Sequence, residues 1–290
     1  MKRLAFLMIL LNLAFINGYE KHNKPIDYYK NGMKKSAGQY VNNQKEGLWR
    51  NWYENGEPES EGEFINGKKH GSWIYWHETG KKRYEQEYKN GKRHGCFISW
   101  YENGGKRTEG EFKTDKRQGA WKWCYPNSQI MFEIEFENDK PHGWCTSWFS
   151  NGVKRMEGEC IQGKKQGHWK RWYESGEIKY EEIYQNDKRE GYWVNWYECG
   201  MKRYEGNYIN DFPEGTWTRW HENGKKCEEG KYKNGVRTGK WTSWYENGKK
   251  YEEGEYKDGL RDGLWKEWDT DGKLIKEEYL LEGKKSKLNF

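Results

Sequence analysis

The feature that most constrains this chain is a 24-residue repeat, which runs through ten copies without an insertion or a deletion. One glycine marks each copy, and the ten are Gly47, Gly71, Gly95, Gly119, Gly143, Gly167, Gly191, Gly215, Gly239 and Gly263. We count this glycine as position zero and compare the copies column by column. A repeat kept so strictly in register predicts equivalent structural units, each stabilised by contact with its neighbours.

Aromatic and acidic residues fill three further columns. Position two is tryptophan in eight copies, with Phe97 and Cys145 as the exceptions. Position five is tryptophan in nine copies: Trp52, Trp76, Trp100, Trp148, Trp172, Trp196, Trp220, Trp244 and Trp268. Position fourteen is glutamate in every copy: Glu61, Glu85, Glu109, Glu133, Glu157, Glu181, Glu205, Glu229, Glu253 and Glu277. Because most of the tryptophans stand in two columns, we expect stacked copies to bury each other's rings.

Each copy is predicted to be a β-hairpin. Positions eight and nine carry Asn-Gly in several copies, as in Asn55-Gly56, and this dipeptide favours a type I′ turn. Folding about that turn pairs position two with position fifteen, a glycine in six copies, over which the opposite tryptophan could lie. A second turn follows at positions nineteen and twenty, as in Asn66-Gly67. The predicted fold is therefore all-β, an elongated single-sheet array of about ten hairpins.

Strand alternation divides these columns between two faces of the sheet. Positions two, six and seventeen, all rich in aromatic residues, fall on one face, and positions five and fourteen fall on the other. A bulge in the short WxxW segment could instead bring both tryptophan columns to one side. We take the position-five tryptophans as a candidate binding face. We interpret the glutamate column as structural, held by cross-strand ion pairs or hydrogen bonds, because an active site is needed only once.

The composition agrees with an ordered chain whose core is aromatic. Aromatic residues make up 18% of the 290 residues, and the net charge of +6 is a small excess of 52 basic over 46 acidic residues. Disorder caused by charge requires a larger excess of one sign. Large rings, each able to bury roughly 150–250 Å², must replace the missing aliphatic core.

The two ends of the chain differ from the repeats. Residues 1–18 have two basic residues, an apolar run and then small or polar residues, which is the order of a signal peptide. Export to the periplasm, the outer envelope or the medium is therefore expected, and an uncleaved anchor or a cytoplasmic location is the alternative. Residues 19–46 form a degenerate capping repeat, residues 47–286 the ten hairpins, and residues 287–290 a short tail.

No column predicts catalysis, a metal site or a cofactor. His70 and His94 share one column but lie two strands apart, about 10 Å, which is too far for one ion. Cys145 and Cys160 form a diagonal pair about 7–8 Å apart, near the limit for a disulfide, and we expect them to act as small apolar side chains. Phosphate loops and nucleophile motifs are absent from the sequence, so we expect a protein that is not an enzyme.

Copies such as GKWTSWYENGKKYEEGEYKDGLRD, residues 239–262, resemble the MORN-repeat variant family. The resemblance covers residues 47–286 and, more weakly, residues 23–46. It implies a short β-hairpin module. Bacterial arrays of this module are often grouped with YwqK-type antitoxin proteins of toxin–antitoxin systems, and related arrays are thought to serve in protein interaction or beside membranes.

Three functions remain open from the sequence. The first is an exported, non-enzymatic scaffold that binds a protein or peptide through an aromatic groove or face, because tryptophan and tyrosine are common interface anchors. The second is association with a membrane surface or a glycan. The third, which the resemblance implies, is a cytoplasmic antitoxin-like partner. Nucleic acid is not expected as a partner, because glutamate is almost as frequent as lysine along the repeats.

Overall fold

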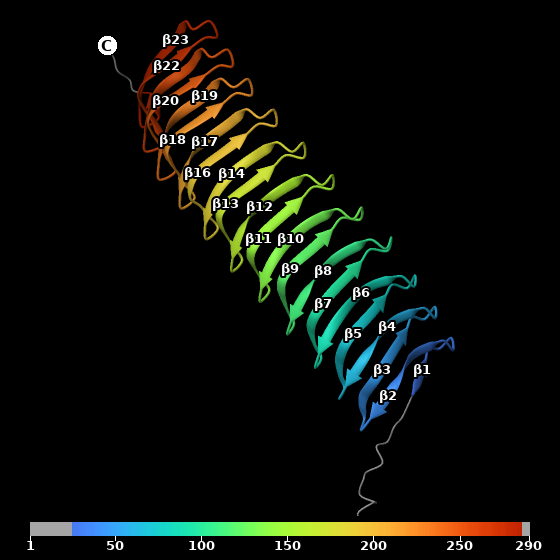
Figure 1. Ribbon diagram of the computed structural model, residues 1–290. Coiled ribbons are helices and arrows are strands. Elements are labelled where there is room, and N and C mark those ends of the chain that lie inside the picture. The colour runs from blue at the N-terminus through green and yellow to red at the C-terminus, as the bar shows by residue number, and fades with distance from the viewer. Residues whose placement is uncertain (1–24, 286–290) are drawn as a thin grey trace, which may run out of the picture. The chain divides into compact units, whose positions relative to one another are not determined.

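The computed structural model describes residues 25–285, and the chain divides into two compact units, the first ending at Lys116 and the second beginning at Arg117. The predicted signal peptide lies outside the described residues. Strands and turns make up all of the described chain, and it contains no helix. The prediction of an all-β hairpin array is confirmed (Figure 1).

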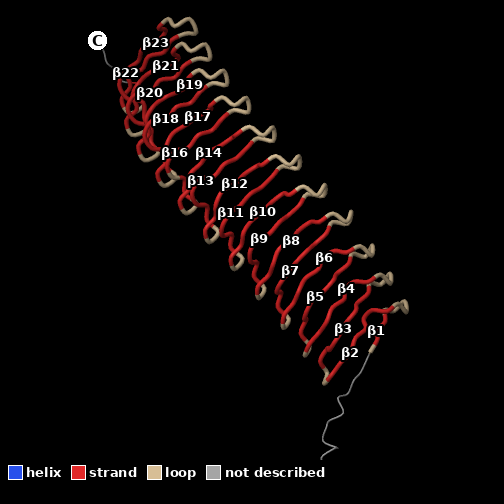
Figure 2. Tube along the Cα trace, viewed as in Figure 1, coloured by secondary structure: helices blue, strands red, loops and turns tan. Residues whose placement is uncertain are grey.

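Within each unit, consecutive strands pair antiparallel, except that β15 and β16 both pair with β14, and turns alternate between the two edges (Figure 2). The first unit contains β1 (Ile26–Tyr28), β2 (Lys34–Val41), β3 (Gln44–Trp52), β4 (Pro58–Ile65), β5 (Lys68–Trp76), β6 (Lys82–Lys89), β7 (Lys92–Trp100) and β8 (Lys106–Lys113). From Lys116 on follow β9 (Lys116–Cys124), β10 (Ile130–Glu137), β11 (Lys140–Trp148), β12 (Lys154–Ile161), β13 (Lys164–Trp172), β14 (Ile178–Gln185), β15 (Lys188–Arg189) and β16 (Gly191–Trp196). The last strands are β17 (Lys202–Ile209), β18 (Phe212–Trp220), β19 (Lys226–Lys233), β20 (Val236–Trp244), β21 (Lys250–Lys257), β22 (Leu260–Trp268), β23 (Leu274–Leu281) and β24 (Lys284–Lys285).

The two turns of each repeat differ in type, and the sequence prediction for the first was wrong. In the turn after β3 only Gly56 has a positive φ, 89°, and its amide donates to the carbonyl of Tyr53. This is a type I turn closed by a glycine bulge rather than a type I′ turn. In the second turn both Asn66 and Gly67 have positive φ, 50° and 72°. The two-residue type I′ turn therefore lies at positions nineteen and twenty.

The ladder register assigns the columns to two faces. Trp49 pairs with Gly62 across β3 and β4, as predicted, and Arg50 pairs with Glu61 beside them. Positions two, four, thirteen, fifteen, seventeen and twenty-two share what we call the inner face, and positions three, five, eleven and fourteen share the outer face. Position six is an exception to the prediction. Tyr53 stands in the turn and donates its hydroxyl to the carbonyl of Trp76, 2.7 Å away, in the next copy.

A second irregularity, at the position-zero glycine, locks each copy to the one before. Between Glu61 and Glu63 β4 advances by two residues while the facing β5 advances by four. The bulge, made possible by a φ of 64° at Gly71, brings Trp73 across the strand. A Cβ on Gly62 would lie only 2.3 Å from the Trp73 ring. The ring that covers this glycine therefore comes from the following copy, and not from the opposite strand of the same hairpin as predicted.

The same indole also forms a hydrogen bond across the copies. The Trp73 Nε1 donates to the carbonyl of Glu63, 3.1 Å away, and tryptophans of five other copies bond in the same way at 3.1–3.2 Å: Trp49, Trp169, Trp217, Trp241 and Trp265. Turn asparagines add a second ladder, in which Asn55 Nδ2 donates to the carbonyl of Glu78 in the next turn. The same contact between copies thus buries the indole ring and gives its N–H a hydrogen-bond acceptor.

Two copies that lack the position-fifteen glycine also lack the following tryptophan. Gln86 pairs with Phe97, and Ile134 pairs with Cys145. Gln86 is 1% exposed, and its Nε2 donates to the carbonyl of Glu87, the acceptor that an indole uses in other copies. In these two places a larger residue at position fifteen is accompanied by a smaller one at position two, whereas the buried Glu182 is followed by a tryptophan, Trp193.

We expect Gly230→Ala to destabilise the fold, because its new Cβ would lie 2.1 Å from the Trp241 ring. Overpacking of this kind costs about 2 kcal/mol, measurable as a fall in the thermal midpoint. Trp241→Phe should weaken the clash, as the Gln86 and Phe97 pair indicates. The contact between Trp241 and Gly230 is contradicted if the double variant loses as much free energy of unfolding as the two single variants together.

Candidate functional site

A column of basic residues lies over the inner aromatic row. Position twenty-two of the preceding copy lies four residues before each position-two residue, and it is Lys or Arg before eight of the ten position-two residues: Lys45, Lys69, Arg93, Arg117, Lys165, Arg189, Arg237 and Arg261. The cations of Lys45, Arg237 and Arg261 stand 4.0 Å from the tryptophan ring that follows them. Each cation is attracted to the ring face and shields it from water. The covered tryptophans are accordingly only 1–6% exposed.

Proline replaces the cation in two copies. Pro141 precedes Cys145, so no tryptophan needs a cover there. Pro213 precedes Trp217, and among residues 25–285 no cation of the chain lies over that ring. Trp217 is the one position-two tryptophan that is half-buried rather than buried. The inner row is therefore open at this ring.

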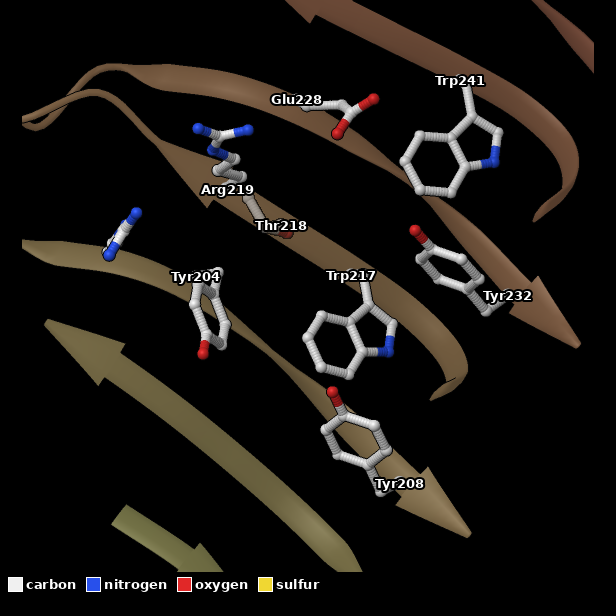
Figure 3. A pocket seen from close by; sticks show the side chains of 9 residues that line it. Tyr204, Tyr208, Trp217, Thr218, Arg219, Glu228, Tyr232 and Trp241 are labelled. Atoms are coloured by element: carbon white, nitrogen blue, oxygen red, sulfur yellow. The ribbon is translucent and has the colours of Figure 1, made fainter. Parts of the chain in front are cut away.

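A pocket of about 350 Å³ opens at the uncovered ring (Figure 3). It is lined by Arg203, Tyr204, Tyr208, Trp217, Thr218, Arg219, Glu228, Tyr232 and Trp241, and we call it the Trp217 pocket. The Tyr208 and Tyr232 rings stand edge-on to Trp217, with centroids 5.0 and 6.1 Å away, and Tyr204 is tilted against it at 6.1 Å. With Trp241, five aromatic side chains therefore line one cavity of a size that suits a side chain or a small ligand.

The charged groups of the pocket stand at its rim. The Glu228 carboxylate forms an ion pair with Arg237, with 2.8 Å between Glu228 Oε1 and Arg237 Nη2. Arg219 faces Glu228 across the ladder and points away from the Trp217 ring (Figure 3). Arg203 lies 5.5 Å from the ring centroid of Tyr197. Burial raises the pKa of Tyr204 and Tyr208, so both hydroxyls stay protonated and neutral.

The tryptophans proposed as a binding face lie on the outer face. All nine are half-buried: Trp52, Trp76, Trp100, Trp148, Trp172, Trp196, Trp220, Trp244 and Trp268. The lysine at position eleven of the preceding copy approaches several of these rings, as Lys250 does Trp268 at 5.5 Å. A second hollow, about 460 Å³, reaches Trp52 beside Pro25, the first described residue. The Trp217 pocket lies on the opposite face from this column.

Every glutamate of position fourteen is paired with a basic side chain. The partners are Arg50 for Glu61, Lys82 for Glu85, Lys106 for Glu109, Lys122 for Glu133, Lys154 for Glu157, Lys170 for Glu181, Lys202 for Glu205, Lys226 for Glu229, Lys250 for Glu253 and Lys266 for Glu277. These ion pairs hold one arginine and nine lysine side chains against the outer face, beside the glutamate column.

The histidines and cysteines form no further site in the described residues. Between residues 25 and 285 no three His, Cys, Asp or Glu side chains gather as metal ligands would. Cys145 and Cys160 are buried free thiols, and the hydrogen bond that Cys145 donates to Cys160, together with burial, raises the pKa of Cys145. No helix that could cross a membrane occurs in residues 25–285.

Comparison with known families agrees with the hairpin geometry. The model of the MORN repeat variant matches residues 45–66, 69–90, 93–114, 117–138, 165–186, 213–234, 237–258 and 261–280, more than half of the chain. The chain belongs to the MORN repeat variant family. The MORN repeat model matches residues 61–72, 135–154 and 204–216.

Individual proteins add little to this assignment. No curated protein matches the chain. A solved structure titled "Crystal Structure of TcdB2-TccC3-Cdc42" is similar to 89% of this MORN variant chain and to 17% of its own, with 8% identity and a TM-score of 0.20. A likeness this weak supports no further argument.

The position-twenty-two column and the Trp217 pocket did not figure in the sequence analysis. Both leave a signal in the sequence, because the column is Lys or Arg except at Pro141 and Pro213. Of these two prolines, only Pro213 is followed four positions further on, at position two, by a tryptophan. Reading the site from sequence would have required knowing that this column reaches across the rings.

We expect Pro213→Arg to stabilise the protein by about 1 kcal/mol, because it restores a cation over the Trp217 ring. Pro141→Arg makes the same change before Cys145, where there is no tryptophan to cover, and should bring no gain. Thermal midpoints of both variants test the role of the column. An equal gain at both sites would contradict it.

Glu253 offers a test of the outer face. Burial acts to raise its pKa, but hydrogen bonds from Lys250 and Lys240 outweigh burial and lower the pKa from its ordinary value of 4.5. A carboxyl group with a lowered folded-state pKa adds stability above about pH 4.5 and loses it as the pH falls through the folded-state pKa. Glu253→Gln should thus cost about 0.5 kcal/mol at pH 7, and little at pH 3. A thermal-midpoint difference that persists at pH 3 would contradict this.

Proposed function

We propose that this protein is a non-enzymatic scaffold that binds a protein partner through its inner face, at the Trp217 pocket. The observation that carries the proposal is the single open ring in a row whose other tryptophans are covered. Tryptophan and tyrosine in a partly desolvated hollow, with arginine at the rim, have the composition of interface hot spots. The other copies supply the rigid frame that such a site requires.

The chemistry of the pocket favours binding over catalysis. Glu228 is engaged by Arg237, and Thr218 Oγ1 donates to Glu229 on the outer face at 3.2 Å. Burial raises the pKa of Tyr204 and Tyr208, so neither hydroxyl is a ready nucleophile. No lining side chain is thus arranged as an activated nucleophile beside a base. We extend the proposal to location: residues 1–18 have the sequence of an export signal, so the partner is expected outside the cytoplasm.

Site-specific photocrosslinking in the source cells tests this proposal. Arg219→p-benzoylphenylalanine places the probe at the pocket rim, and we expect one discrete protein adduct. Ser243→p-benzoylphenylalanine occupies the same repeat position beside the covered Trp241 and should give none. Trp220→p-benzoylphenylalanine probes the outer face. An adduct from position 220 alone would move the binding face to the outer tryptophan column, and adducts from none of the three would contradict the scaffold function.

A further inference from the structure

We propose that the Trp217 pocket receives the side chain of an arginine or a lysine from a partner protein, carried on a segment with acidic residues on either side. The inference rests on the proposed function and names the chemistry of the partner. It follows from comparing the open pocket with the closed ones in the same chain.

The closed copies show what this kind of pocket holds. The Lys69 ammonium lies 4.3 Å from the ring centroid of Trp73, 5.1 Å from that of Tyr75 and 5.2 Å from that of Tyr88. The Arg237 guanidinium lies 4.0 Å from the Trp241 centroid and 5.4 Å from that of Tyr256. Each cation covers the position-two and position-seventeen rings of the next copy. Both ammonium and guanidinium groups are thus accepted over these rings.

The Trp217 pocket has the rings of a closed copy without the cation. Pro213 pairs with Tyr208 in the ladder, where Arg237 pairs with Tyr232 one copy later. A cation at residue 213 would therefore reach Trp217 and Tyr232. Proline offers no such group, so the ring faces remain available to a cation from outside. Tyr204, at position thirteen, adds a further ring where the Arg237 copy has Glu228.

The rim charges determine what must flank the incoming cation. Arg203 and Arg219 line the pocket, and its one carboxylate, Glu228, already pairs with Arg237. A bare cation would meet two positive charges, whereas acidic neighbours on the same segment can pair with these arginines. Complementarity therefore favours a basic side chain between acidic ones over an isolated amine.

The test uses the full chain and the peptide acetyl-Glu-Glu-Arg-Glu-Glu-amide. Its matched control replaces arginine with citrulline, which keeps the shape and hydrogen-bonding capacity but removes the positive charge. Isothermal titration gives the dissociation constants. We expect the arginine peptide to bind at least tenfold more tightly than the citrulline peptide.

Two variants localise the binding. Pro213→Arg, which closes the pocket with the chain's own cation, should weaken binding of the arginine peptide at least tenfold. Pro141→Arg adds the same charge before Cys145, where position two has no tryptophan, and should leave the affinity unchanged. The shift of the Trp217 indole N–H signal in NMR spectra should follow the same order.

Equal binding of the arginine and citrulline peptides, equal binding by the Pro213→Arg variant, or no binding of either peptide would overturn the inference. The proposed function is tested separately. If the adduct at position 219 forms while the peptides fail, the scaffold function stands and its partner presents another group. If neither occurs, both proposals are wrong.

Discussion

The fold depends on one contact, which recurs in most copies: the tryptophan at position two lies on the glycine at position fifteen of the copy before. A lone hairpin has no second layer against which to bury an indole. Here the bulge at the position-zero glycine carries the ring of Trp73 over Gly62, and the indole N–H finds a backbone carbonyl in the same neighbouring copy. Stability therefore comes from the junctions between copies, as expected for a repeat protein.

The basic side chains of position twenty-two cover the indole rings on the side that the sheet does not. In a single sheet the inner rings would face water on one side, and the long side chains of Lys and Arg cover them while their charges remain near solvent. The contact between a cation and an aromatic ring thus stabilises the fold and also underlies the proposed binding. Wherever the chain provides the cation before a position-two tryptophan, that ring is buried, and at Trp217, where Pro213 provides none, the ring is open to a partner.

Strict repetition made the hairpin architecture predictable, because ten copies reveal columns that one copy would hide. Local geometry was less accessible. Asn55-Gly56 has the composition of a type I′ turn, but only Gly56 takes a positive φ, since Tyr53 and Glu57 close a longer loop. The bulge that shifts Trp73 onto the preceding copy has no sequence signal beyond one glycine. The role of Pro213 could be recognised only once the structure showed that the side chains of position twenty-two extend over the aromatic rings.

Hydroxyl-radical footprinting with mass spectrometry tests the central claim most directly, because it reports the solvent exposure of each indole in the intact protein. The account predicts that Trp217 is oxidised several times faster than Trp193 and Trp241, which occupy the same column in the adjacent copies. It also predicts that Pro213→Arg lowers the rate at Trp217 to that of its neighbours. Equal rates at the three tryptophans in the unaltered protein would show that the row has no open position, and would contradict the account.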